Sequence, residues 1–140
     1  MAFKLIPDPT FKSKVTLRAP GKKEEKVEFT FRFLNEEERR SINEAQKAKV
    51  DELRNQFGVP EEEIEAAIKS KTLDEQTFNE YLRSLRAVRL PYFMKIVAGW
   101  ELIDDFNEEN VAALLRNYSS AFNSILETYR DEVEGARIKN

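Results

Sequence analysis

The chain has 140 residues, with 23 Lys and Arg against 26 Asp and Glu, and it contains neither Cys nor His. The length predicts one domain spanning residues 1–140. Without Cys there is no disulfide framework or thiol nucleophile, and without His the commonest metal ligand and neutral-pH acid–base group is missing. The composition therefore argues against an enzyme. We predict no catalytic residue, no metal site and no cofactor.

Targeting signals are not apparent in the sequence. The N-terminal residues carry Lys4, Asp8 and two prolines where a secretory signal would need a longer apolar core. The longest mostly apolar run, residues 90–100, is too short to cross a bilayer and includes Lys95. We therefore expect a cytoplasmic protein that has no membrane partner.

The first structural pattern is an alternation of apolar and polar residues between about residues 11 and 34. Val15 and Leu17 precede the turn sequence Pro20-Gly21, and a run from Val27 through three phenylalanines to Phe33 follows it. A period of two in residues rich in β-branched and aromatic side chains predicts an antiparallel β-hairpin. The apolar face must lie against another element, because an isolated hairpin is marginally stable in water.

Residues 35–135 change to the period of helices. Asn35 is suited to cap a long, polar helix that ends at Gly58, and Glu36–Glu38 favour its N-terminal end. Further helices are expected from Pro60, from a cap at Thr72 to an end or kink at Pro91, from a cap at Asn107 to about residue 117, and from Ser119 or Ser120 to Gly135. Residues 136–140 form a short polar tail. The predicted fold is α+β, a hairpin followed by a bundle of four to six helices.

Charge is unevenly distributed along the chain. Residues 11–33 contain seven basic and three acidic side chains, whereas residues 101–134 contain nine acidic and two basic ones. Such regions can steer partners or promote self-association, but they can equally be ordinary solvated faces. The acidic balance of the whole chain argues against a nucleic-acid-binding module, despite the basic series Arg83, Arg86 and Arg89.

A series of short stretches, taken in order, covers nearly the whole sequence. They are Met1-Ala2-Phe3-Lys4-Leu5, Pro7-Asp8-Pro9-Thr10-Phe11, the Phe-rich residues 27–33, Ile96-Val97-Ala98-Gly99-Trp100-Glu101-Leu102, Phe106-Asn107-Glu108-Glu109-Asn110, Ala112-Ala113-Leu114-Leu115, Asn117-Tyr118, Ala121-Phe122, Tyr129, Ala136-Arg137 and Lys139-Asn140. With these stretches the sequence resembles the tail assembly chaperones of long-tailed bacteriophages.

The resemblance implies a role and no catalytic site. It implies a non-catalytic protein that binds and solubilises the tape-measure protein and helps recruit the major tail (tube) protein. Such a protein works in the cytoplasm of an infected or lysogenic bacterium and is absent from the mature virion. A long tape-measure helix exposes apolar surface until the tube encloses it, so its cover must be soluble and displaceable. A structural tail protein is the main alternative function, and a small nucleic-acid-binding protein is a weaker one.

The expected contact residues for such a partner are aromatic. They are Phe29, Phe31, Tyr92, Phe93 and Trp100, because aromatic side chains dominate protein interfaces. Packing in the core explains each of these side chains at least as well, and for the phenylalanines of the hairpin it is the favoured interpretation.

Overall fold

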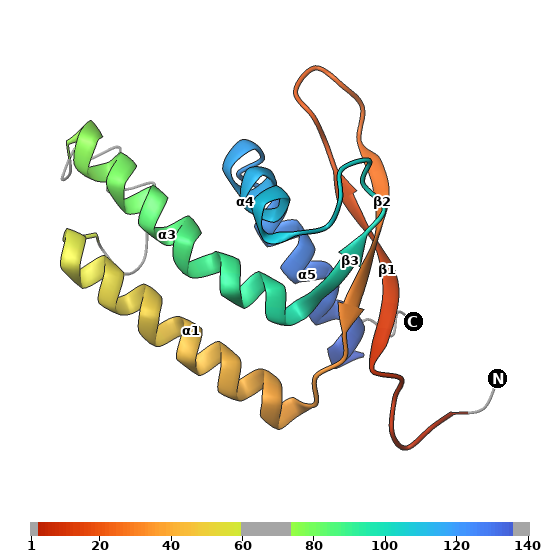
Figure 1. The fold of residues 1–140 in the computed structure, drawn as a ribbon. Helices are drawn as coiled ribbons and strands as arrows, with labels where there is room; N and C mark the ends of the chain where they lie inside the picture. Colours follow the sequence, from red (N-terminus) through yellow and green to blue (C-terminus); the bar gives the residue numbers. More distant parts are fainter. Residues whose placement is uncertain (1–2, 60–73, 136–140) are drawn as a thin grey trace. The chain divides into compact units, whose positions relative to one another are not determined.

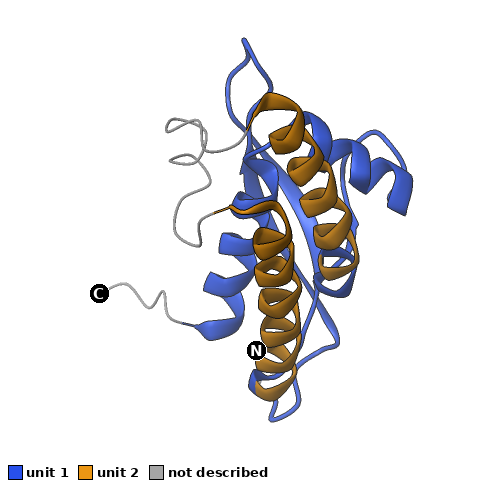
Figure 2. Ribbon diagram, turned by 90° about the vertical axis from the view of Figure 1, so that its left-hand side faces the viewer, with its two compact units in different colours: residues 1–36, 93–140 blue, residues 37–92 orange. Residues whose placement is uncertain are grey.

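We analysed a computed structural model of the chain, which describes residues 3–59 and 74–135. The described residues fall into two compact units, one made of residues 1–36 and 93–140 and the other of residues 37–92 (Figure 2). The predicted helix from Pro60 and the predicted cap at Thr72 lie outside the described residues.

The first unit is built on the predicted hairpin. Strands β1 (Thr10–Leu17) and β2 (Glu25–Arg32) pair antiparallel along their full length. Ala19 accepts a hydrogen bond from the backbone N–H of Lys22 at 3.1 Å, which closes a tight turn over Pro20-Gly21. Gly21 has φ of +76°, a conformation that glycine adopts without strain at the third position of such a turn.

A third strand, β3 (Val97–Trp100), pairs antiparallel with β2 and gives the sheet order β1-β2-β3 (Figure 1). The sequence did not predict β3. It has four residues and includes Gly99, so it shows too little alternation to stand out from the apolar run before it.

Helix α5 (Ala121–Glu134) covers one face of the sheet, and α4 (Glu108–Asn117) lies beside α5 (Figure 1). The ring of Tyr129 lies 6.0 Å from that of Phe11 and 5.5 Å from that of Phe31, and its hydroxyl donates to the backbone oxygen of Arg32 at 2.9 Å. The apolar face of the hairpin therefore finds its partner in α5. This arrangement, with four helices among the described residues, confirms the predicted α+β fold.

Helix ends follow the predicted signals in three places. The Asn107 side chain caps α4 by accepting from the N–H of Asn110 at 2.8 Å. Gly58 and Gly135 have φ of +69° and +57°, the left-handed conformation that ends a helix. Ser120 occupies the N-cap position of α5, but its side chain makes no capping hydrogen bond.

The second unit pairs most of α1 (Glu36–Phe57) with α3 (Glu75–Ile96) up to Tyr92, as Figure 2 shows in orange. The two helices run antiparallel, because the Tyr92 hydroxyl donates to the Asn43 side chain at one end while Leu53 packs in a cluster with Tyr81 at the other. The cluster buries Leu53, Val59, Tyr81 and Leu85, with Val50, Phe57, Phe78, Leu82 and Val88 packed against them.

The sequence predicted an end or a kink of this helix at Pro91. The helix does not end at Pro91 but continues to Ile96, and Pro91 lies on its exposed side. A proline inside a helix removes one backbone hydrogen bond, which neighbouring turns can tolerate. At the N-terminal end Asp74 accepts from the backbone N–H of Thr77 at 2.7 Å, and this hydrogen bond lowers the pKa of the Asp74 carboxyl.

The two buried tyrosines, one in each unit, differ in how their hydroxyl groups are satisfied. The Tyr129 hydroxyl donates to Arg32, whereas the buried Tyr81 hydroxyl has no hydrogen-bond partner among the residues that the structure describes. A buried polar group without a partner costs free energy, whereas a satisfied one contributes modestly to stability. The two hydroxyls should therefore respond differently to removal.

We expect Tyr129→Phe to lower the free energy of unfolding by about 1 kcal/mol. The matched variant Tyr81→Phe removes only an unpartnered hydroxyl, so it should leave the stability unchanged or raise it. Chemical denaturation followed by circular dichroism measures both changes. A loss in Tyr81→Phe as large as that in Tyr129→Phe would show that the Tyr81 hydroxyl is satisfied after all.

The same burial predicts a dependence on alkaline pH. Desolvation raises the pKa of the Tyr81 phenol above its ordinary value of 10.0. The unfolded chain therefore ionises first, and stability falls as the pH rises above about 10. The melting temperature should drop between neutral and alkaline pH more steeply in the natural protein than in Tyr81→Phe. Parallel pH profiles would contradict this origin of the effect.

Candidate partner-binding groove

The first unit has a groove of about 630 Å³ at the turn end of the hairpin. Its walls come from the hairpin loop, from the segment that follows β3, from α4 and from the beginning of α5. The lining residues are Leu17, Arg18, Ala19, Lys22, Lys23, Glu25, Val27, Trp100, Leu102, Ile103, Asp104, Asn110, Ala113, Leu114, Asn117, Tyr118, Ser120 and Ala121. We call this feature the hairpin groove.

The floor of the hairpin groove is apolar. Val15 on β1 and Phe29 on β2 are fully buried, but two residues further toward the turn Leu17 and Val27 are only partly covered and line the groove. Leu114 on α4, 9% exposed, faces the groove with them. The groove is therefore a continuation of the core face of the sheet that the chain itself does not fill.

Trp100 forms a fixed wall of the hairpin groove. Its ring meets Phe29 edge-on at 6.1 Å and Phe106 edge-on at 5.0 Å. Its indole N–H donates to the backbone oxygen of Asp104 at 2.8 Å. A ring held by two aromatic neighbours and a hydrogen bond has little rotational freedom, so it can bind a partner at a small cost in entropy.

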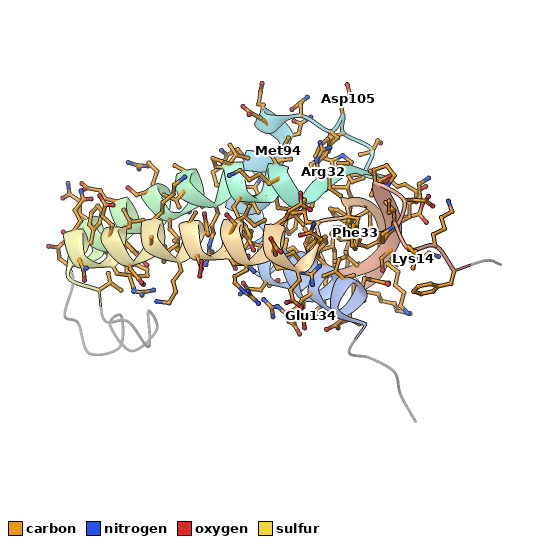
Figure 3. All side chains as sticks on the ribbon, turned by 90° about the horizontal axis from the view of Figure 1, so that it is seen from below. Lys14, Arg32, Phe33, Met94, Asp105 and Glu134 are labelled. Atoms are coloured by element: carbon orange, nitrogen blue, oxygen red, sulfur yellow. The ribbon has the colours of Figure 1, made fainter. Side chains whose placement is uncertain are left out.

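The segment between β3 and α4 presents an apolar side chain to solvent. Ile103 is 99% exposed, next to Asp104, which receives the Trp100 hydrogen bond. The Asn110 side chain donates to the backbone oxygen of Asp105 at 2.7 Å, and Asp105 lies on this loop in Figure 3. The loop is thus held at both ends while Ile103 covers nothing of its own chain, which is a typical arrangement for an interface anchor.

The rim of the hairpin groove carries basic side chains on the hairpin side. Arg18 donates from Nε to the backbone oxygen of Lys22 at 2.9 Å, which braces the loop, and Lys22 and Lys23 are exposed. Glu25 and Asp104 are the carboxylates in the lining. The hairpin side of the groove therefore favours negatively charged groups on whatever it binds.

The structure brings only part of the predicted contact set to this groove. Trp100 lines it, and Phe29 lies behind Trp100 in the core. Phe29, Phe31 and Phe93 are fully buried, and Tyr92 is half-buried in the helical unit, where it binds Asn43. No observation tests whether these five residues bind a partner, and that role stays a prediction. The burial of three of them identifies them as core residues of this fold.

Sequence reasoning missed Ile103 and the basic rim as parts of one site. The Leu102-Ile103 pair falls between two regular elements and belongs to no helical or strand period, and this is the signal that could have identified it. Lys22 and Lys23 come near Ile103 only because β3 pairs with β2. Such a long-range pairing cannot be read from local pattern.

Other kinds of site are not evident in the described parts of the chain. No group of three or more acidic side chains is placed to hold a metal ion within residues 3–59 and 74–135. In the same residues no helix combines the length and the apolar character that crossing a membrane requires.

These features define a small α+β protein with a partly apolar groove and an exposed aliphatic side chain at its rim. A family model described as phage tail assembly chaperone matches residues 1–140, the whole chain. The chain therefore belongs to the phage tail assembly chaperone family. No curated protein and no solved structure matches it.

The exposure of Ile103 can be tested separately from any partner. Ile103→Ser should change the free energy of unfolding by less than about 0.5 kcal/mol, because the side chain makes almost no contact in the free protein. Trp100→Ala, which removes the packing on Phe29 and Phe106, should cost roughly 3 kcal/mol. Urea denaturation of both variants measures the difference. A large loss in Ile103→Ser would mean that Ile103 is part of the fold.

Proposed function

We propose that the protein binds the tape-measure protein of its phage, keeps it soluble and helps recruit tail-tube subunits during tail assembly. Membership of the tail assembly chaperone family across all 140 residues is the observation that carries this proposal. The role is one of binding and release and requires no reactive side chain. It places the protein in the cytoplasm of the bacterial host and outside the mature virion.

The hairpin groove supports the proposal with a physical means of binding. A tape-measure protein exposes apolar surface until the tube surrounds it, and exposed apolar surface leads to aggregation. The groove offers apolar floor residues and the preorganised Trp100 and Ile103 to such a surface. Its basic rim is solvent-exposed, so the complex can remain reversible.

The N-terminal segment offers a second exposed apolar surface. Phe3, Leu5 and Ile6 are 96%, 97% and 83% exposed. This segment leaves the hairpin at the end opposite the turn, since Phe33 donates its N–H to Pro9 at 2.8 Å (Figure 1). It is a candidate surface for the tail-tube protein or for self-association of the chaperone.

Co-expression with the tape-measure protein in a bacterial host tests the proposed function. We expect the chaperone to raise the soluble fraction of the tape-measure protein several-fold and to co-purify with it. Ile103→Asp should reduce the amount recovered, because it places a charge at the centre of the contact. Thr16→Asp is the control, since it places the same charge at an exposed position of the hairpin that does not line the groove.

If the same amount of soluble tape-measure protein is recovered with and without the chaperone, the proposal is contradicted.

Mass spectrometry of purified virions tests whether the protein is part of the finished tail. The chaperone should be absent from virions, whereas stoichiometric amounts in the tail would identify it as a structural tail protein.

A further inference from the structure

The hairpin groove has a definite chemistry that limits what can occupy it. Its volume of about 630 Å³ falls within the range of roughly 300–1,000 Å³ that is usual for ligand sites. A groove of this size accepts a few large side chains and not a single small group. Because Leu17, Val27 and Leu114 form its floor, the inserted side chains must be apolar.

The walls of the groove suit a helix better than an added strand. Strand β2, which contributes Glu25 and Val27, is already paired with β1 over residues 25–32 and with β3 at Phe29–Phe31. Strand β2 therefore offers only a short free edge at the groove, and the longer free edge of the outer strand β1 meets the groove only at its end, at Leu17. An amphipathic helix needs no such edge, because its backbone is satisfied internally and its apolar side chains enter a groove as a stripe.

The charges around the groove select the polar face of that helix. Arg18, Lys22, Lys23 and Glu25 line the hairpin side, which leaves it with a net positive charge, and the Arg18 side chain is oriented by its hydrogen bond to the backbone oxygen of Lys22. On the other side Asp104 lies next to Ile103, and its backbone oxygen is occupied by Trp100. A bound helix therefore gains from acidic residues along the edge that faces the hairpin loop.

The chain's own N-terminal segment cannot serve as the occupant within one molecule. It starts at the open end of β1, and the eight residues of that strand separate it from the groove by about 26 Å. Residues 3–8 reach at most roughly 21 Å when fully extended. This excludes residues 3–8 of the same molecule as the occupant.

We propose that the hairpin groove binds an acidic amphipathic helix of the partner, with its apolar stripe on Leu17, Val27 and Leu114 between Trp100 and Ile103, and its carboxylates beside Lys22 and Lys23. The inference deepens the proposed function and rests on it, because the helix belongs to the protein that the chaperone covers. It specifies what the groove recognises: an apolar stripe on a helix that carries negatively charged side chains beside the stripe.

Trp100 is the only tryptophan in the chain, so its fluorescence reports directly on the groove. The probes are two synthetic peptides of roughly 18 residues, long enough to form a helix on binding. Both carry Leu at i, i+3, i+4 and i+7, and they differ in having Glu or Lys at the remaining positions. A third peptide keeps Glu and replaces the Leu stripe with Ser.

We expect the Glu peptide to shift the Trp100 emission and to bind about tenfold more tightly than the Lys peptide at low ionic strength. The Ser-striped peptide should not bind. Lys22→Glu with Lys23→Glu should remove or reverse the preference. The matched control, Lys14→Glu with Lys26→Glu, reverses two exposed charges on the same hairpin that do not line the groove, and it should keep the preference.

Several results would overturn the inference. The inference fails if no peptide changes the Trp100 emission, or if the Glu and Lys peptides bind with equal affinity. It also fails if the control variant loses the preference for the Glu peptide as fully as the groove variant does. Binding of the Ser-striped peptide would show a general anion surface instead. Self-association that Leu5→Asp abolishes, and that blocks the Glu peptide, would assign the groove to the N-terminal segment of a second copy.

The peptides contain no tape-measure sequence, which separates this test from that of the proposed function. If the Glu peptide binds but the tape-measure protein does not co-purify, the groove inference stands and the assigned partner is wrong. If the tape-measure protein co-purifies and Trp100 does not respond to any peptide, the function stands and the groove inference fails.

Discussion

A row of contacting aromatic rings holds the first unit together and also creates its binding surface. The ring of Tyr129 on α5 lies 5.5 Å from Phe31, Phe31 lies 6.2 Å from Phe29, and Phe29 lies 6.1 Å from Trp100. Trp100 continues the row to Phe106 at 5.0 Å. These contacts join α5, β2, β3 and the loop before α4. Because the row ends at Trp100 and Phe106, the buried core passes directly into the wall of the hairpin groove.

The local elements of this fold could be predicted from the sequence. Alternation around Pro20-Gly21 identified the hairpin, and the left-handed Gly21 explains why a glycine is needed there. Asn107 and Gly135 marked helix ends correctly because capping depends on residues close in the chain. An end or a kink was predicted at Pro91, and the helix does not end there, since a single exposed proline removes only one backbone hydrogen bond from it.

The site could not be predicted to the same extent. The sequence favoured core packing for the hairpin phenylalanines, but which side chains Phe29 and Phe31 contact could not be read from it, and the structure packs them on Trp100 and Tyr129. The groove itself depends on the pairing of β3 with β2, which brings residues near position 100 beside residues 18–27. Ile103 becomes part of the groove because of that long-range pairing and not because of its neighbours in sequence.

The absence of His and Cys from the sequence fits a protein that works by covering and releasing another. The net charge of −3 is a sum of separate regions, and the basic hairpin loop forms one rim of the groove. Affinity in such a site comes from a few preorganised apolar contacts, while the exposed charges set the choice of partner. Both contributions are reversible, as the proposed function would require of a cover that is later displaced.

Photo-crosslinking during phage assembly tests the central claim most directly. A photoreactive amino acid at position 103 should crosslink to the tape-measure protein in infected cells, and mass spectrometry should map the adduct to an acidic amphipathic segment. The same amino acid at position 14, which is exposed but lies outside the groove, should give no such adduct. A tape-measure adduct from position 14 and none from position 103 would contradict the account.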